Sequence, residues 1–494
     1  RKKIRIIFTA SLSFAKEKTK QLLGKVIQKL KKPLLKKKQL KYYMKVQKSY
    51  SAKIERISDY YFVEKKLKVL FLVIFSSVFP SRPVFEKMLQ DDTFDPYIMV
   101  IPDMQRSSDH KIMTLSETFD ELSRCYGERV ICGYDYKSDT YQKPDDDVKI
   151  VFFNNPYSRM AHKYHHVTYF LNKDVLPIYI NYGFAAVKYG RIIMETDFYN
   201  LCWKVCLDSM INLDDLKEHQ AIKGKNAFVT SYLKMDRYAQ AAVYTRTRKT
   251  IIISPHHTVA GWKSLDISNF ISYSDFFLEL PLLYPNIDFV FRPHPLLFDN
   301  LLAYKMWSQE KINAYLNQIE AIPNMRYDHS GDYFELFANS DGIVHDCSSF
   351  IGEYLFTEKP CCYMLKNEQE IQDVMNPMGI ACMENYYKAY GKDDILRFID
   401  EVILKGIDPL KEQREEFSRK ILKFNYPHSA EAVIRMLKES IRCGGNGISE
   451  GSKHSTDFVW RNRDTNADGQ SAETVSCGAG TPHLGLLPVH VSES

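Results

Sequence analysis

The residues with the clearest chemical potential lie in a turn after a short apolar run in the second half of the chain. Asp341 to Val344 is predicted to be a buried strand, and His345 to Ser349 is the turn that leaves it. Loops at the carboxyl ends of strands bind ligands in open α/β sheets, and a helix amino terminus attracts phosphate. Ser348 and Ser349 are therefore predicted to hold an anion. Glu353, one helical turn further, is predicted to reach a ribose hydroxyl pair, although Ser, Asp and Glu are also ordinary helix-capping residues.

A second group of candidate residues follows another predicted strand about fifty residues upstream. Arg292 and His294 alternate with Pro293 and Pro295, and proline fixes the backbone and blocks helical continuation. Arg292 can bind phosphate oxygens through two N–H groups, and His294 can donate to a phosphate or carry a proton. A charged surface turn is the alternative interpretation. Both turns are expected at the same edge of one sheet, which favours a nucleotide site.

Two alternations of strands and helices must position these turns. The first predicted series has the strands Lys68 to Phe75, Tyr97 to Ile101, Val130 to Gly133, Val148 to Phe153, Val175 to Tyr182 and Ala227 to Thr230, with helices at Arg82 to Gln90 and Ile112 to Cys125. The second has the strands Thr250 to Ser254, Ile287 to Arg292, Met325 to Tyr327, Asp341 to Val344 and Pro360 to Leu365, with helices at Tyr273 to Leu283, Leu301 to Gln318, Asp332 to Asn339, Phe350 to Glu358, Asp393 to Leu404, Lys411 to Phe424 and Ala430 to Arg442. This order predicts an α/β protein with two doubly wound, Rossmann-like domains that face each other across a cleft, and a last helix that returns to the first domain.

The charge is distributed unevenly. Residues 1–56 contain 19 Lys and Arg but only two acidic residues, a balance of +17, so the remaining chain carries −11 of the total of +6. An acidic body is not built to bind nucleic acid over its surface. From Ser11 to about Ser58 leucines and other apolar residues recur at helical spacing among lysines, with an interruption at Pro33. We expect this basic amphipathic arm to lie on an anionic membrane surface, with packing on a protein as the alternative.

The other composition features are less specific. The ten cysteines show no CxxC spacing, and Cys202 and Cys206 are predicted to share one helical stretch, which fits free thiols in a reducing compartment and gives little support to a zinc site. No apolar run approaches the length of a transmembrane helix, and no cleavable signal is recognised. Residues 443–494 are rich in Gly, Ser, Thr and Asn and are predicted to be disordered.

These motifs carry a resemblance to a known family. FRPHP at 291–295 and DGIVHDCSSFIGEYLFTEKPCCYML at 341–365 resemble the "HP" and "serine" motifs of the CDP-glycerol glycerophosphotransferase family, which builds wall teichoic acid. The residues at matching spacing are Asp346, Ser348, Ser349, Glu353 (for the family's Asp), Pro360 and Tyr363. Ile253 to His257 and Val229 to Arg237 match more weakly, and the resemblance covers about residues 69 to 440.

The resemblance implies a GT-B fold and a function. Residues 61–245 would form the acceptor domain, residues 246–442 the nucleotide-donor domain with its return helices, and residues 1–60 a membrane-associating segment at the cytoplasmic face of the cell membrane. Arg292, His294, Asp346, Ser348, Ser349 and Glu353 would bind the CDP-activated donor, without a metal or another cofactor. The acceptor would be a glycan or a lipid-linked molecule of a surface polymer, teichoic-acid-like or capsular.

One departure concerns the catalytic base. The family has a Trp-His-Gly segment, and Tyr182 stands where its His is expected if Gly183 matches the glycine. A tyrosine of ordinary pKa is a poor base at neutral pH. His256 or His257 could serve instead, although a structural turn is the simpler interpretation of this pair. A sugar transferase that uses a CMP- or UDP-activated donor, a sugar-nucleotide 2-epimerase whose acid and base carboxylates we do not find, and a non-catalytic scaffold subunit remain alternatives.

Overall fold

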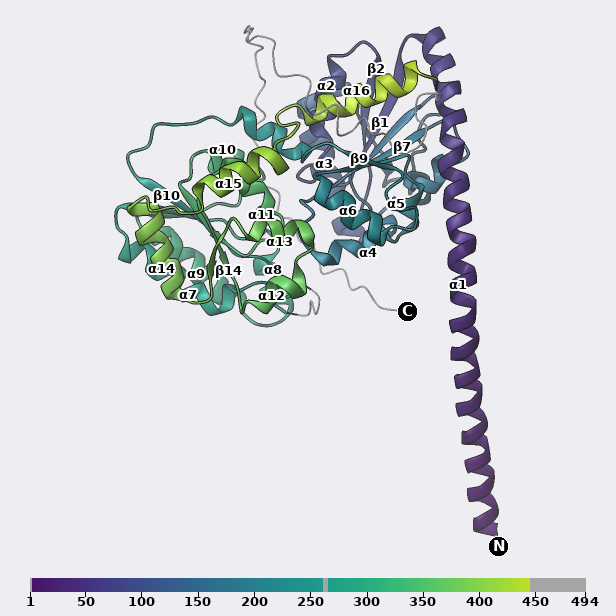
Figure 1. Cartoon of the computed structure of the whole chain (residues 1–494), viewed down its shortest axis with the longest axis horizontal. Coiled ribbons are helices and arrows are strands. Elements are labelled where there is room, and N and C mark those ends of the chain that lie inside the picture. Colours follow the sequence, from purple (N-terminus) through teal and green to yellow (C-terminus); the bar gives the residue numbers. More distant parts are fainter. Residues whose placement is uncertain (1, 261–264, 445–494) are drawn as a thin grey trace. The chain divides into compact units, whose positions relative to one another are not determined.

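The computed structural model describes residues 2–260 and 265–444, with side-chain surroundings from residue 33 onward (Figure 1). The chain divides into two compact units, Arg1–Tyr50 and the part that begins at Ser51. The disorder predicted for residues 443–494 falls almost wholly on residues outside the described part. The apolar pattern predicted for the arm lies mostly on residues 1–32, whose side chains are also outside it.

The basic arm is part of one long helix, α1 (Lys2–Glu64), which contains Pro33. The predicted interruption at Pro33 is therefore wrong. A proline removes one backbone hydrogen bond, and the lysines and leucines on both sides are good helix formers, so the helix can continue beyond it. In the second unit the last turns of α1 are attached to the body: Lys53 Nζ donates to the carbonyl of Leu171 at 2.8 Å, and Arg56 pairs with Asp174 at 2.7 Å.

The first domain is built on a parallel sheet of seven strands in the order β3-β2-β1-β6-β7-β8-β9. Its strands are β1 (Leu67–Val73), β2 (Phe94–Val100), β3 (Val130–Cys132), β6 (Ile150–Phe153), β7 (Leu176–Ile180), β8 (Lys204–Leu207) and β9 (Ala227–Val229), and a separate hairpin joins β4 (Tyr134–Asp135) to β5 (Thr140–Tyr141). Its helices are α2 (Arg82–Leu89), α3 (Ser108–Tyr126), α4 (Arg191–Met194), α5 (Asp197–Leu201) and α6 (Met210–His219). β1 is apolar because it is buried on both faces.

The second domain has a parallel sheet of six strands in the order β12-β11-β10-β13-β14-β15. Its strands are β10 (Lys249–Ser254), β11 (Ile287–Phe291), β12 (Met325–Tyr327), β13 (Gly342–His345), β14 (Cys361–Met364) and β15 (Tyr387–Ala389). Its helices are α7 (Phe270–Leu283), α8 (Leu297–Ala303), α9 (Gln309–Ala321), α10 (Phe334–Ala338), α11 (Phe350–Glu353), α12 (Gln369–Val374), α13 (Pro377–Met383), α14 (Lys392–Arg397) and α15 (Lys411–Phe417). The predicted fold class, two Rossmann-like doubly wound domains of the GT-B type, is confirmed.

Three local predictions are wrong. Cys206 lies in strand β8 rather than in a helix, because KVCL at 204–207 alternates too briefly to be told from a helix segment. The single helix predicted at Leu301 to Gln318 is two helices, α8 and α9, separated where Lys305 adopts a positive φ of 55°. The helix predicted at Phe350 to Glu358 is one α-turn, α11, followed by a 3₁₀ turn, Tyr354–Thr357, that ends at Glu358 with φ 62°.

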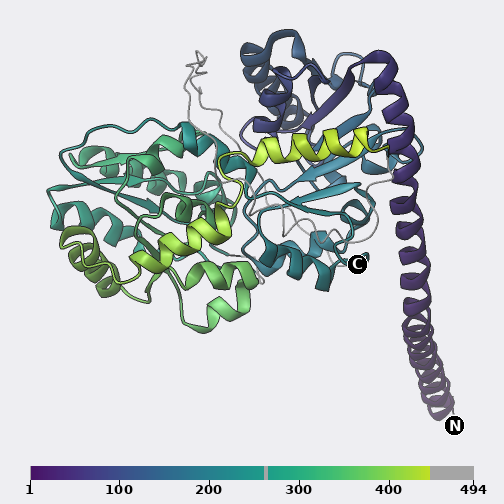
Figure 2. The same cartoon turned by 45° about the horizontal axis from the view of Figure 1, so that its top comes forward.

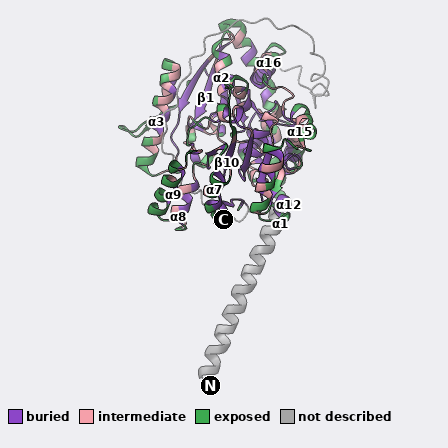
Figure 3. Cartoon of the chain, turned by 90° about the vertical axis from the view of Figure 1, so that its left-hand side faces the viewer, coloured by how far each residue is buried: buried purple, intermediate pink, exposed green. Residues whose placement is uncertain are grey.

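The last helix, α16 (Ser429–Arg442), returns to the first domain and packs beside α2, as the yellow-green helix in Figures 1 and 2 shows. Lys87 on α2 pairs with Glu431 at 2.8 Å, and Lys438 pairs with Asp91 at 2.5 Å. Figure 3 shows the strands of both sheets as buried and the outer faces of α3 and α9 as exposed. Because α16 returns to the first domain, the chain crosses between the domains twice. The outward crossing lies between β9 and β10, and the return crossing precedes α16.

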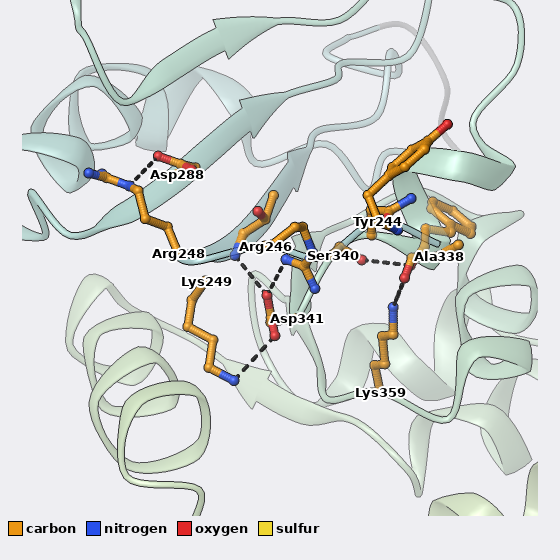
Figure 4. A network of polar contacts seen from close by, with 12 residues as sticks. Tyr244, Arg246, Arg248, Lys249, Asp288, Ala338, Ser340, Asp341 and Lys359 are labelled. Carbon is orange, nitrogen blue, oxygen red and sulfur yellow. Dashed lines mark hydrogen bonds and ion pairs between the residues drawn. The ribbon is translucent and has the colours of Figure 1, made fainter. Parts of the chain in front are cut away.

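The outward crossing is attached to the second domain by ion pairs (Figure 4). Arg246 and Lys249 both reach the carboxylate of Asp341, at 2.6 and 3.2 Å, and Arg248 pairs with Asp288 at 2.7 Å. Lys359 caps the end of α10 by donating to the carbonyl of Ala338 at 2.6 Å. These contacts lie at the amino end of β10 and β13, so the opposite end of the sheet is left for a ligand.

Candidate functional site

Three loops meet at the carboxyl end of the second sheet. β10 lies between β11 and β13, so the loops that follow these strands, Pro255–Thr258, Arg292–Pro295 and Asp346–Ser349, are neighbours. The order of the strands reverses between β10 and β13, which is where open α/β sheets bind ligands. The structure thus brings together the two predicted motifs and the His256-His257 pair.

Asp346 holds two of these segments in place. The side chain is fully buried, and its carboxylate accepts from the backbone N–H of His256 at 2.5 Å and from that of Asn269 at 2.6 Å. Burial raises the pKa of Asp346 to about 7, while these N–H donors act in the opposite direction. Asp346 is thus placed to position the His256 loop, and its burial separates it from a ligand.

Three imidazole rings cluster beside it. The ring centroids of His257 and His294 are 4.1 Å apart, and those of His256 and His257 are 4.4 Å apart. One ring nitrogen of each histidine lies within 4.8 Å of one ring nitrogen of the other two. Such a cluster could hold either a metal ion or an anion, and the positions of the ring protons decide between them.

Hydrogen-bond donors at Nδ1 indicate where those protons are. The backbone N–H of Leu296 donates to His294 Nδ1 at 3.2 Å, and the side-chain amide of Asn300 lies 2.9 Å from His257 Nδ1 while it also donates to the His257 carbonyl. The backbone N–H of Thr258 donates to His256 Nδ1 at 3.4 Å. Since each Nδ1 is an acceptor, each neutral ring carries its proton on Nε2. His256 Nε2 lies 3.5 Å from the Ser348 hydroxyl.

The three rings are neutral at ordinary pH. Burial lowers the pKa of His257 to about 4 and holds the pKa values of His256 and His294 well below the usual range, with repulsion by neighbouring histidines as a further cause. A neutral ring with its proton on Nε2 is a hydrogen-bond donor at that atom and cannot ligate a metal there without losing the proton. The cluster is therefore better suited to an oxyanion than to a metal ion.

Arg292 is placed at the same site, but part of its guanidinium already donates hydrogen bonds within the protein. Its Nη1 donates to Asp328 at 2.8 Å and to the Ser330 hydroxyl at 3.1 Å, and its Nη2 donates to the Ser330 carbonyl at 2.7 Å. The guanidinium lies 5.3 Å from the ring centroid of Tyr333. A guanidinium has five N–H groups, so two remain for a ligand. Asp328 fixes its orientation.

Glu353 is buried in a cluster of aromatic and basic residues. It accepts a short hydrogen bond from the Tyr333 hydroxyl, and it is only 1% exposed. Lys234, half-buried, lies 4.7 Å from the Tyr333 ring centroid, and burial lowers its pKa although Glu353 raises it. The Tyr232 hydroxyl also bonds to this carboxylate, so ribose binding by Glu353 would compete with both tyrosines. Lys234 adds a cation that the sequence did not single out.

Ser349 precedes α11, but this helix is only four residues long. A helix of one turn has a small dipole, so it adds little to anion binding. The Ser348 and Ser349 side chains are half-buried, and Ser348 faces His256. Phosphate binding here would therefore depend on hydroxyl and imidazole groups.

Tyr182 lies in the first domain, after β7, and is 38% exposed. Its hydroxyl is 2.9 Å from that of Tyr157, and its carbonyl accepts from the Tyr232 hydroxyl at 3.5 Å. Although part of the residue is exposed, desolvation of the hydroxyl raises the pKa of Tyr182, so it holds its proton at neutral pH. The structure records no contact between Tyr182 and the three histidines among the residues it describes.

The loop that follows Tyr182 packs on the second domain. Asn376 donates from its side chain to the Ala185 carbonyl at 2.9 Å and from its backbone to the Ala186 carbonyl at 3.0 Å. Phe184 lies against α11, where a Cβ on Gly352 would come within 2.1 Å of the ring. Helix α11, which follows Ser349, therefore rests directly on the first domain.

Several residues of this site had no signal in the sequence. Asn300, Thr258 and Asn269 act through hydrogen bonds to the histidine loops or to Asp346. Asparagine and threonine are common loop residues. Only the adjacency of β11, β10 and β13 places them at the site. Lys234 lay within the weakly matched segment Val229 to Arg237, which was the one available indication.

Comparison with known proteins gives similarity in structure alone. No protein-family model matches the sequence, and no curated protein matches it. UDP-GlcNAc 2-epimerase from Neisseria meningitidis bound to UDP-GlcNAc is 12% identical, with a TM-score of 0.46 over 76% of this chain and 100% of that chain. The wall teichoic acid polymerase TagF is 12% identical, with a TM-score of 0.41 over 66% of this chain and 85% of that chain. A TagF variant with CDPG is also 12% identical, with a TM-score of 0.46 over 83% and 98%. Scores this low carry no argument about substrate or mechanism.

Proposed function

We propose that the protein is a GT-B transferase that moves glycerol phosphate, or a related phosphopolyol, from a CDP-activated donor to a glycan or lipid-linked acceptor. The observation that carries the proposal is the cluster of His256, His257 and His294, with protons on Nε2, beside Ser348 at the reversal of strand order in the second sheet. The sequence resemblance supplies the donor class. The site supplies the reason to expect a diphosphate.

The site suits a diphosphate because its donors are neutral and preorganised. Three imidazole N–H groups and two serine hydroxyls can bind phosphate oxygens, and Arg292 and Lys234 add positive charge. In the transfer step the acceptor oxygen bonds to the phosphorus of the glycerol phosphate and the bond from that phosphorus to the CMP oxygen breaks. The acceptor hydroxyl gives its proton to water or to a basic side chain. Charge that develops on the departing CMP phosphate is then stabilised by these groups.

This assignment gives His256 and His257 a different role from the base considered from the sequence. A base must offer a lone pair, and the Nδ1 lone pairs of both rings are occupied by donors from Thr258 and Asn300. We therefore propose that both histidines donate to the donor phosphates, together with His294. Tyr182 also holds its proton, so the acceptor hydroxyl must lose its proton elsewhere.

Calorimetric titration with CDP-glycerol, CDP, CMP and UDP, with a chelator present, tests the proposal. We expect tight binding confined to the cytidine diphosphates. We expect no gain in affinity from histidine protonation between pH 7.5 and 5.5, because burial keeps the pKa values of the three rings below this range and each Nδ1 already accepts a hydrogen bond. Preference for CMP or UDP would move the assignment to a sugar transferase. Absence of binding by all four would remove the transferase function and favour the scaffold.

Matched variants separate the histidine cluster from the rest of the chain. His294→Ala should weaken CDP binding at least tenfold, whereas His110→Gln, on the exposed face of α3, should leave it unchanged. Ser348→Ala combined with Ser349→Ala should weaken CDP binding more than CMP binding, because the second phosphate depends on those hydroxyls. Equal losses for both nucleotides would refute the phosphate role of the serines.

We further propose that the arm attaches the enzyme to the cytoplasmic face of the membrane as a peripheral protein. Between residues 33 and 50, Lys36, Lys37, Lys38, Lys41, Lys45 and Lys48 are exposed. Within the described part of the chain, no helix has the length and apolar character needed to span a bilayer. Flotation with vesicles of phosphatidylcholine alone or with added phosphatidylserine tests the arm, and binding that ignores the anionic lipid would refute it.

A further inference from the structure

A pocket in the first domain has no role in the donor site described above. It lies at the carboxyl ends of the central strands. Its lining includes Leu72 in the last part of β1 and Ile74 just after it, Phe153 at the end of β6 with Asn154 and Asn155 after it, and Tyr157, Ser158, Ala161, His165 and His166 from the following loop. β1 and β6 are the two strands between which the order of this sheet reverses. The pocket thus occupies the ligand-binding position of a doubly wound domain.

The polar side chains that shape the pocket are mostly engaged with one another. Asn154 accepts from the Ser81 hydroxyl at 2.6 Å and donates to the Leu72 carbonyl at 3.0 Å, which ties the end of β6 to β1. Asn155 accepts from the backbone N–H of Tyr157 at 2.8 Å. These hydrogen bonds hold the side chains that form the walls of the pocket in place.

His165 differs from these residues. It is 1% exposed, and its Nδ1 is buried without a hydrogen-bond partner among the described residues. Its Nε2 is 2.9 Å from the Gln142 carbonyl, which can only accept, so Nε2 carries the proton and Nδ1 has a lone pair. An unpaired buried acceptor of this kind is destabilising, and a ligand that donates a hydrogen bond to it would remove this penalty. Burial also lowers the pKa of His165 to about 4, so the ring stays neutral and the lone pair is available at ordinary pH.

We propose that this pocket binds a hydroxyl group of the acceptor and that His165 Nδ1 accepts its hydrogen bond. The identity of the ligand as a transfer acceptor rests on the proposed function; the presence of a hydroxyl-binding pocket does not. The groups around the pocket favour a polyol end: Ser158 and Tyr157 offer hydroxyls, and His166 Nε2 donates to the Ala161 carbonyl at 2.8 Å, so its Nδ1 is also an acceptor.

The pocket is connected to the loop that reaches the donor domain. Tyr157 lines the pocket, and its hydroxyl is 2.9 Å from that of Tyr182. Tyr182 is followed by Gly183 and then by Phe184, which packs on α11 next to Ser349. A ligand in the pocket would therefore contact a residue whose neighbours touch the donor-site helix.

Two substitutions of His165 separate binding from support of the fold. In His165→Gln the side-chain amide can still donate to the Gln142 carbonyl, but no acceptor remains at the Nδ1 position. In His165→Asn the amide oxygen can take the place of Nδ1, but the bond to Gln142 is lost. The probe is sn-glycerol 3-phosphate, a polyol phosphate. Its binding to the full chain is measured by saturation-transfer NMR.

We expect His165→Gln to weaken binding of the probe at least tenfold and His165→Asn to weaken it less than threefold, with His110→Gln unchanged. If both His165 variants lose binding equally, the residue is structural and the proposal fails. Ala161→Leu adds bulk to the pocket lining while His165 itself is unchanged, and it should also abolish binding, which protects the test against a His165 variant that does not fold. Wild-type protein that does not bind the probe, with Nδ1 satisfied by a single water, would overturn the proposal.

CDP titration of the same variants distinguishes this inference from the proposed function. His165→Gln should bind CDP as the wild type does. If the wild type does not bind CDP but binds the probe in a way that depends on His165, the transferase function is refuted and the pocket is supported. Normal CDP binding with no probe binding would support the donor site and refute the pocket.

Discussion

The contact between Gly352 and Phe184 makes a sharp prediction about the join between the domains. A Cβ built on Gly352 would lie 2.1, 2.2 and 2.3 Å from Cε1, Cζ and Cδ1 of Phe184, where normal contacts are 3.4–4 Å. Gly352→Ala therefore forces the Phe184 ring to move by more than 1 Å. Phe184 is 5% exposed and packs edge-on against Tyr232, with ring centroids 5.6 Å apart, so the ring has little room to move.

The expected cost follows from overpacking of a dense core. Insertion of one methyl group typically costs 1–3 kcal/mol, and a contact this short belongs at the upper end, about 3 kcal/mol. Phe184→Ala removes all three of these ring atoms and should cost about 3–5 kcal/mol alone. In the double variant the two losses should not add, because the Ala side chain at 184 leaves space for the methyl group at 352. We expect a coupling free energy of at least about 1 kcal/mol in favour of the double variant.

Urea unfolding of the wild type, both single variants and the double variant measures this coupling from the midpoints at constant slope. Gly331→Ala is the control, because a Cβ there has no heavy atom within 4 Å. Nucleotide titration should also detect the change, since α11 follows Ser349. If Gly352→Ala is as stable as Gly331→Ala, or if the two losses add, Phe184 does not pack on Gly352 in solution and the described join between the domains is wrong.

Three further predictions concern the two sites. The pKa of His165 is about 4 in the folded chain and near 6.5 in the unfolded chain, so only the unfolded chain takes up this proton between pH 6.5 and 4. The free energy of unfolding should therefore fall by about 1.4 kcal/mol per pH unit below 6.5, to a total loss of about 3 kcal/mol. Urea unfolding from pH 7.5 to 4.5 checks this, and His165→Gln should show a shallower loss. Asn300→Leu removes the donor that fixes the His257 ring and should weaken CDP binding about tenfold in calorimetry, with CMP less affected. Lys234→Met removes a cation beside Glu353 and Arg292. We expect it to lower CDP affinity about tenfold, with the loss disappearing at high salt, whereas a salt-independent loss would indicate a packing effect.

The strands were predictable because most are apolar runs buried on both faces, as in β1 and β10. β8 and β15 were missed because each is only three or four residues long and contains lysine. The break at Lys305 was missed because no glycine or proline marks it. At the site, the residue types of Arg292, His294 and Ser348 were enough to find the loops. The engagement of Arg292 by Asp328 and the burial of Asp346 depend on contacts between distant segments, which periodicity does not encode.

The same reasoning explains why the sequence makes His256 and His257 candidate bases, whereas the hydrogen bonds at their Nδ1 atoms lead us to propose that they donate from Nε2. A histidine pair after a strand is compatible with either role, because the choice depends on which ring nitrogen meets a donor. Asn300 lies 43 residues beyond His257 in the chain and supplies that donor. His165 shows the opposite case, since the Gln142 carbonyl fixes the proton on Nε2 and leaves Nδ1 as an acceptor. In the proposed reaction, the histidines at the two strand-order reversals share one tautomer but have opposite roles. Those of the second domain would donate hydrogen bonds to a phosphate, and His165 of the first would accept one from a hydroxyl, which suits transfer of a phosphoryl group to an alcohol.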